Sequence, residues 1–197
     1  FKVILRDGTV VMQRQTETYF LSPQLQLIRT VSSKYRTLVG VLQPDRLVYA
    51  VFNDARFYLH VHCAHNNTLL TILPQTFTGA GISIAEHRDS GWFAVVDVEE
   101  SKIHIYTRNY NLVSSNVMKD EIPQRHAAAA VKDWIIVACQ DYNVVCVCIY
   151  NWYGERNGKV LLHDFSADLG CIMGVGAASS DTIWIVYQDA VALYKVE

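Results

Sequence analysis

An alternating pair of apolar residues recurs along the chain at a spacing of 44 residues. The pairs are Leu59 and Val61, Ile103 and Ile105, Val147 and Ile149, and Val191 and Leu193. Tyr106, Tyr150 and Tyr194 follow three of these pairs, and His62 follows the first. Apolar residues two apart indicate strands with one face fixed in a core. A fixed long period indicates a chain built from repeated structural units.

Each repeat contains signals for four strands. A second apolar run precedes each pair, at residues 47–52, 92–96, 134–139 and 183–187. A run of small residues precedes each of these second runs, at residues 38–42, 81–85, 126–131 and 173–178. A fourth run lies downstream in the repeat, at residues 25–28, 69–73, 112–114 and 160–162. The turns before the fourth runs carry Ser22-Pro23, Asn66-Asn67, residues 109–111 and Asn157-Gly158. The small-residue runs are expected to be innermost strands, where bulky side chains would collide. Residues 127–130, all Ala, could instead form a turn of helix.

Four strands in about 44 residues are typical of one blade of a β-propeller. The sequence therefore predicts an all-β fold, a segment of 4–5 four-stranded blades over residues 1–34, 35–77, 78–121, 122–167 and 168–197, with a weaker hairpin at 7–12 and 18–21 in the first. The chain is expected to begin in the second strand of one blade and to end after the third strand of another, with 18 strands in all. Such a segment does not close, so further blades or a partner are expected to complete it.

The repeat resembles the WD40 family, whose third strand ends in an apolar-x-apolar-Trp-Asp pattern. Three repeats here keep this form with Tyr for Trp, at residues 103–106, 147–150 and 191–194. Thr107, Asn151 and Lys195 stand where the family has Asp, and the family's Gly-His pair is missing, so NHL-type or other propellers stay open. The resemblance implies a rigid disc that binds proteins or peptides within a larger scaffold, signalling or regulatory protein, and it transfers no binding residue.

The composition of the chain narrows the classes of partner and environment that are expected for it. The chain is 51% hydrophobic and 18% charged with a net charge of -2, which suits strands buried on both faces and argues against nucleic acid as the main partner. Its longest apolar run, residues 144–150, is too short to cross a membrane as a helix. The chain opens on residues that read as the middle of a strand, with no signal peptide, which predicts a piece of a longer protein. Five cysteines, an odd number, favour a reducing, cytoplasmic environment.

One histidine cluster has metal-ligand character. His60 and His62 share a strand face, and Cys63 and His65 lie close by in the sequence. Exposed histidines two apart are common on strands, and we therefore predict no metal and no cofactor while leaving a role for His60, His62 and His65 open.

No clear catalytic constellation is present in the sequence. Paired carboxylates occur only at Glu99-Glu100 and Asp120-Glu121, in expected turns, and Cys171 reads as a core residue. We predict a protein that is not an enzyme and that works by protein–protein interaction. Two alternatives are an enzyme or carbohydrate-binding propeller that uses the central channel, and a module that only packs against neighbouring domains or subunits.

The segment 151–158 is the best candidate for a binding site. It is expected to be the longest hairpin loop, and it places Trp152, Tyr153 and Arg156 together. Trp, Tyr and Arg dominate the binding energy of protein interfaces. The alternative is that Trp152 folds back as a plug on its own blade. The sequence therefore predicts protein binding at Trp152, Tyr153 and Arg156, with the plug left open.

Overall fold

The chain is built from β-strands. A computed structural model describes residues 2–5, 7–78, 81–118, 125–141, 144–162, 170–177, 179 and 182–195. Over these ranges there are nineteen strands and no helix, which confirms the predicted all-β class. Within the same ranges, no helix is present that could cross a bilayer. The strands fall into two compact units, unit 1 (Phe1–Ala80) and unit 2 (Gly81–Glu197).

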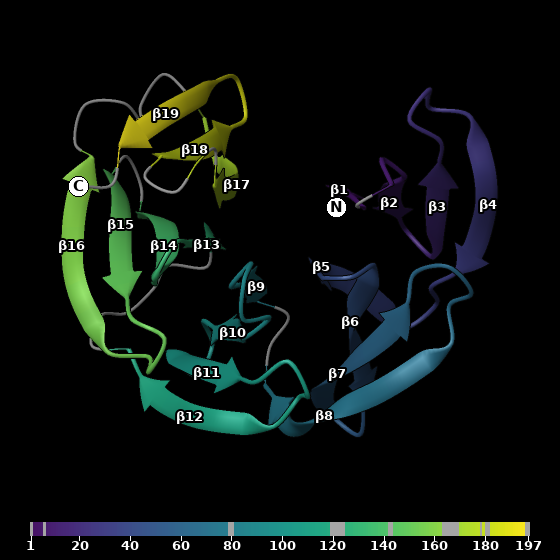
Figure 1. Ribbon diagram of the computed structural model, residues 1–197, viewed down its shortest axis with the longest axis horizontal. Helices are drawn as coiled ribbons and strands as arrows, with labels where there is room; N and C mark the ends of the chain where they lie inside the picture. Colours follow the sequence, from purple (N-terminus) through teal and green to yellow (C-terminus); the bar gives the residue numbers. More distant parts are fainter. Residues whose placement is uncertain are drawn as a thin grey trace. The chain divides into compact units, whose positions relative to one another are not determined.

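Unit 1 contains two four-stranded antiparallel sheets in which each strand pairs with the next along the chain (Figure 1). The first sheet consists of β1 (Lys2–Ile4), β2 (Val10–Arg14), β3 (Glu17–Leu21) and β4 (Leu27–Ser32). The second consists of β5 (Arg36–Leu42), β6 (Arg46–Asn53), β7 (Arg56–Cys63) and β8 (Leu69–Phe77).

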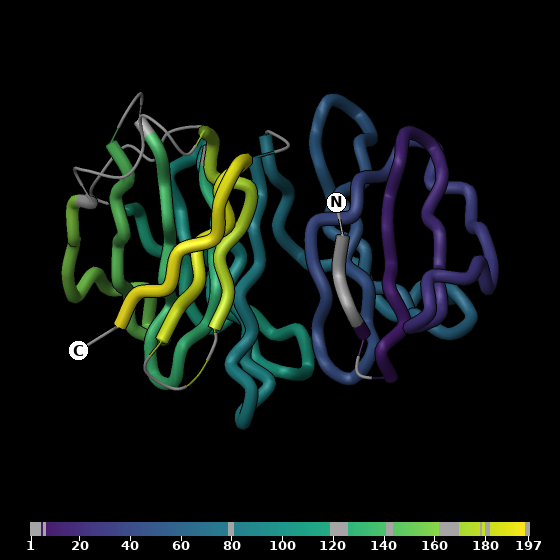
Figure 2. The backbone as a smooth tube through the Cα atoms, turned by 90° about the horizontal axis from the view of Figure 1, so that it is seen from above, coloured from purple at the N-terminus to yellow at the C-terminus, as the bar shows by residue number. Residues whose placement is uncertain are grey.

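Unit 2 contains three sheets with the same up-and-down order, as the backbone trace in Figure 2 also shows. The first has β9 (Ile82–Glu86), β10 (Phe93–Asp97), β11 (Lys102–Tyr106) and β12 (Leu112–Val117). The second has β13 (Arg125–Val131), β14 (Trp134–Asp141), β15 (Val144–Tyr150) and β16 (Arg156–Leu162), and the third has β17 (Ile172–Ala177), β18 (Thr182–Tyr187) and β19 (Val191–Lys195). The first strands β9, β13 and β17 contact one another in succession, whereas β12 and β16 lie on the outside of unit 2 (Figure 1).

Three details of the sequence interpretation need correction or completion. The chain starts with the first strand of a sheet, β1, so the described residues form nineteen strands and the prediction of 18 is wrong. Asn157 and Gly158 lie within β16, because the turn before that strand is already complete at Glu155. Residues 127–130 belong to β13, which settles the open choice between strand and helix in favour of strand.

The core lies between adjacent sheets of each unit. Leu59, Val61, Ile103 and Ile105 of the repeated pairs are fully buried, as alternation predicts. Val191 and Leu193, at the equivalent positions of β19, are 65% and 67% exposed. In the other four sheets this strand is flanked by a fourth, and within the described residues no fourth strand pairs with β19.

Two glutamines join neighbouring sheets through backbone hydrogen bonds. In unit 1, the Gln13 side chain donates to the Arg36 carbonyl (2.7 Å) and accepts from the Leu38 N–H (2.6 Å). In unit 2, Gln140 donates to the Gly170 carbonyl (3.3 Å) and accepts from the Ile172 N–H (2.8 Å). Both residues lie one position before the last cross-strand pair of their hairpin. The same polar clamp, a Gln side chain that bonds one carbonyl and one N–H of the next sheet, therefore recurs in both units.

Small residues in a first strand have a further cause within the sheet itself. Gly176 of β17 pairs with Trp184 of β18, and a Cβ at Gly176 would overlap the Trp184 ring. The three atoms nearest to such a Cβ all belong to Trp184, the residue opposite on the paired strand. Here glycine makes room for an aromatic ring that lies across the strand.

Candidate functional site

The turn between β15 and β16 spans Asn151–Glu155 and is tightly hydrogen-bonded. The Gly154 N–H donates to the Asn151 carbonyl, and the Asn151 N–H donates to the Glu155 carbonyl, both at 2.9 Å. The Asn151 side-chain oxygen also accepts from the N–H groups of Tyr153 (3.0 Å) and Glu155 (2.9 Å). Turns with the same backbone bonds occur at residues 22–26 and 107–111. The site is therefore a regular five-residue turn, and the longer loop expected from the sequence is not formed.

Gly154 allows this turn to form. Its φ is +81°, a conformation in which residues with a Cβ are strained. A Cβ there would lie 2.7 Å from Asn116 Nδ2 and 3.1 Å from Ile103 Cγ2. The turn thus sits directly against the preceding sheet, and glycine is the residue that fits both its conformation and its space.

Trp152 points into the protein. Its ring packs against the buried cluster between the sheets β9–β12 and β13–β16, and it meets the His87 ring edge-on at 5.3 Å between centroids. This arrangement corresponds to the plug alternative, with the difference that the ring fills space between two sheets. Trp152 anchors the turn.

Tyr153 and Arg156 lie on the surface beside this anchor. The Tyr153 side chain is 65% exposed, and Arg156 is exposed at the start of β16. The Tyr153 carbonyl accepts hydrogen bonds from Ser114 Oγ (3.1 Å) and from Asn116 Nδ2, both on β12. The backbone under the exposed ring is therefore fixed from two sides. The sequence did not reveal these β12 contacts, because nothing in it shows which strand borders the turn.

The histidine cluster is not assembled as a metal centre. His62 is buried, with Nδ1 3.0 Å from the Asn67 carbonyl oxygen, and its ring stacks on that of His60 at 6.2 Å. His65 is 66% exposed and lies 3.5 Å from Asp45 Oδ2. Burial lowers the pKa of both His60 and His62 below the ordinary value of 6.5. Within the part of the chain that is described, no three His, Cys, Asp or Glu side chains are placed to hold a metal ion.

Three thiols of unit 2, those of Cys139, Cys146 and Cys148, belong to its core. Cys139 pairs across the sheet with Cys146, its Sγ lies 3.6 Å from the Cys146 carbonyl oxygen, and both contribute with Cys148 to the same buried cluster. The hydrogen bond with Cys148 and burial raise the pKa of the Cys139 thiol. A protonated, buried thiol is a poor nucleophile. Cys171 is half-buried and forms no disulfide.

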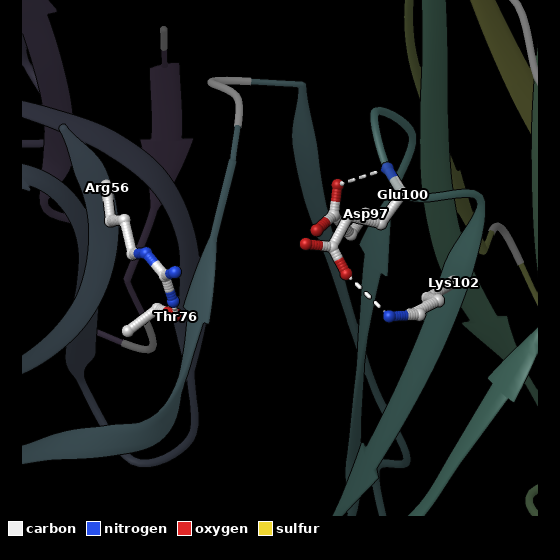
Figure 3. Close-up of polar contacts among 5 residues, drawn as sticks. All are labelled: Arg56, Thr76, Asp97, Glu100 and Lys102. Carbon is white, nitrogen blue, oxygen red and sulfur yellow. Dashed lines mark hydrogen bonds and ion pairs between the residues drawn. The ribbon is translucent and has the colours of Figure 1, made fainter.

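The carboxylates of the β10–β11 turn bond to other groups of the same turn (Figure 3). Asp97 is fully buried and accepts a hydrogen bond from the Glu100 N–H (3.3 Å), while Glu100 pairs with Lys102 at 2.7 Å. Burial raises the pKa of Asp97 above its ordinary value of 3.8. The other predicted pair, Asp120 and Glu121, lies outside the described residues.

Similar folds occur among solved structures at low sequence identity. Virginiamycin B lyase from Staphylococcus aureus matches with a TM-score of 0.66 and 9% identity over 100% of this chain and 69% of its own. Hydrazine synthase from Kuenenia stuttgartiensis matches with a TM-score of 0.66 and 10% identity over 100% of this chain and 62% of its own. BBS1N, solved in complex with ARL6DN, matches with a TM-score of 0.60 and 11% identity over 99% of this chain and 64% of its own.

These matches and the five sheets confirm the predicted β-propeller fold. No protein-family model and no curated protein matches the sequence. The chain spans 62–69% of the length of the three structures named. At 9–11% identity they share the fold alone with this chain.

Proposed function

We propose that this chain is a divergent WD40-like propeller segment that works as a non-enzymatic protein–protein interaction module of a larger scaffold or regulatory protein. The exposed Tyr153 ring on an immobilised turn carries the proposal. Tyr and Arg contribute most to affinity where little conformational freedom is lost on binding. Hydrogen bonds from two sides already order the backbone beneath Tyr153, and Arg156 lies close by in sequence at the first position of β16.

The contacts of the polar and reactive groups support a non-catalytic function. Asp97 and Cys139 are buried, and Glu100 is engaged by Lys102. Five cysteines that form no disulfide support a reducing cytoplasmic location. Structures with this fold include a lyase and a synthase as well as BBS1N in complex with ARL6DN, so the fold admits enzymes and protein binders. The exposed Tyr153 and Arg156 side chains at the turn favour protein binding.

A quantitative pull-down tests the proposal. The full chain and its Tyr153→Ala and Arg156→Ala variants are immobilised, and captured proteins are compared by mass spectrometry. We expect each variant to lose most of the recovery of at least one shared protein, by about tenfold or more. Leu25→Ala is the matched control, because Leu25 occupies the equivalent turn before β4 and is 67% exposed. Recovery unchanged in both variants relative to Leu25→Ala rejects the site.

A further inference from the structure

The two units carry opposite net charges. Unit 1 has eight Lys or Arg and four Asp or Glu, a formal charge of +4, whereas unit 2 has nine and fifteen, a charge of -6. The two charges add to the net charge of -2 of the whole chain, and that total does not reveal the opposite signs of the two units. A partner that meets unit 1 therefore meets a basic surface. Complementary charge steers such a partner and selects against others.

Three connections of unit 1 lie together at one end of its strands. Because the strands alternate in direction, the β2–β3 turn, the β4–β5 connection and the β6–β7 turn share the same end. Backbone hydrogen bonds link them directly. The Ser33 N–H donates to the Thr16 carbonyl (2.7 Å), and the Phe52 N–H donates to the Tyr35 carbonyl (3.4 Å).

Two aromatic side chains are exposed at this end, Tyr35 in the β4–β5 connection and Phe52 near the end of β6. Tyr35 is 74% exposed, with a backbone φ of +65° that holds it at the tip of its turn. Phe52 is 54% exposed and is supported by the tilted ring of Phe57 at 5.0 Å. The hydrogen bond between the backbones of Tyr35 and Phe52 makes them neighbours. Neighbouring exposed aromatic side chains are typical of a surface that a partner covers.

Three cations lie at the same end of the strands as the aromatic pair. Arg14 and Arg56 are exposed at the ends of their hairpins, and the Lys34 ammonium lies 5.0 Å from the centre of the Tyr35 ring. Arg56 donates through Nη1 to Thr76 Oγ1 (3.1 Å), an uncharged partner within unit 1 (Figure 3). Among the described residues, no ion pair engages any of the three.

The acidic groups of the same connections already have partners. Glu17 accepts a hydrogen bond from the Tyr19 hydroxyl. Asp54 Oδ2 accepts from Asn53 Nδ2 at 3.0 Å. Both donors are uncharged, so the two carboxylates keep their negative charge, and Arg14, Lys34 and Arg56 outnumber them by one on these connections.

We propose that the face made by Arg14, Lys34, Tyr35, Phe52 and Arg56, the basic loop face, binds an acidic polypeptide segment that carries an apolar side chain. The carboxylates meet the three cations, and the apolar side chain covers the two rings. Separate cations around an aromatic pair suit a peptide better than a nucleic acid, which would call for a longer basic stripe. This face belongs to unit 1 and is independent of the Tyr153 turn of unit 2.

Fluorescence anisotropy of the full chain with a labelled peptide tests the assignment. The probe is a short peptide of Glu and Asp with one central Leu, and a second probe carries Gln and Asn in place of the acids. We expect saturable binding of the acidic probe that weakens as salt rises, with little binding of the neutral one. Lys34→Glu combined with Arg56→Glu should weaken binding about tenfold or more. Tyr35→Asn, which keeps the left-handed turn conformation, should also weaken it.

Matched variants distinguish this face from the rest of the surface. Arg88→Glu removes an exposed cation of unit 2 and should leave binding of the acidic probe unchanged. Equal binding by the Lys34→Glu and Arg56→Glu double variant overturns the proposal. Tighter binding of a single-stranded oligonucleotide than of the peptide, lost in the same variant, reassigns the face to nucleic acid. Self-association in sedimentation that the double variant abolishes reassigns it to a second copy of the chain.

Discussion

At the scale of single residues, Trp152 and Tyr153 show how neighbours in one turn take opposite positions. Trp152 packs against the buried cluster between its own sheet and the preceding one, and its ring meets that of His87. The hydrogen bonds of the turn then direct Tyr153 outward. Gly154 makes both possible through its backbone conformation.

Replacement of Gly154 by Ala should destabilise the turn. The added Cβ would be strained at a φ of +81° and would press on Asn116 and Ile103. We expect the free energy of unfolding to fall by about 2 kcal/mol, as measured by urea denaturation. Gly158→Ala is the control, because a Cβ there meets only Ile149 Cδ1, at 4.0 Å. Equal stability of the two variants would contradict the assigned role of Gly154.

Buried His104 should make the fold sensitive to mild acid. Burial lowers the pKa of His104 below its ordinary value of 6.5, and the charge of Lys102 lowers it further. As the pH falls, His104 is therefore protonated in the unfolded chain before it is protonated in the folded chain. The contribution of neutral His104 to the free energy of unfolding is fully present above pH 6.5 and is lost as the pH falls below that value. Denaturation midpoints measured at several pH values should fall toward acid in the wild type and less steeply in His104→Leu.

Ile105 on the same strand provides the control for this titration. Ile105→Val should keep the wild-type slope, because Ile105 is buried like His104 and carries no ionisable group. Asp97 acts in the opposite sense, since burial raises its pKa, and it is present in every variant compared. The difference between His104→Leu and wild type therefore isolates the histidine. A wild-type slope in His104→Leu would show that other groups cause the acid sensitivity.

At the scale of strands and sheets, polar clamps add specificity to apolar packing. Gln13 and Gln140 occupy equivalent positions and each satisfies an N–H and a carbonyl of the next sheet. The equivalent position on β10 is Val96, which is fully buried. Neighbouring sheets are thus joined by hydrogen bonds at some junctions and by aliphatic contact at others.

Gln140→Leu should destabilise unit 2. The substitution keeps a similar volume but leaves the buried Ile172 N–H without its side-chain acceptor, a change that costs about 1–3 kcal/mol. Hydrogen exchange should report faster opening of β17 in the variant. Gln26→Leu, on the exposed turn before β4, is the control and should leave exchange unchanged. Unchanged protection of the Ile172 amide in Gln140→Leu would argue against the clamp.

At the scale of the whole molecule, the periodic part of the fold could be predicted from the sequence. Alternation at a fixed period predicts both that Ile103 and Ile105 belong to a strand and which face of that strand is buried. Both side chains are buried in the structure. The opening residues read as a strand but were not counted as the first strand of a blade, because the three residues of β1 carry too short a pattern to assign a place in the repeat. The inward position of Trp152 and the anchoring of Tyr153 by β12 depend on contacts between sheets, which no local pattern encodes.

The proposed function rests on the surface at Tyr153, and site-specific photo-crosslinking in cells tests it most directly. A photoreactive phenylalanine analogue is placed at position 153 of the chain, and at position 25 as the control, because both side chains are exposed on equivalent turns. We predict a discrete crosslinked protein at position 153 that is lost on Arg156→Ala and is absent at position 25. No crosslinked protein at position 153, or the same products at both positions, would contradict the account.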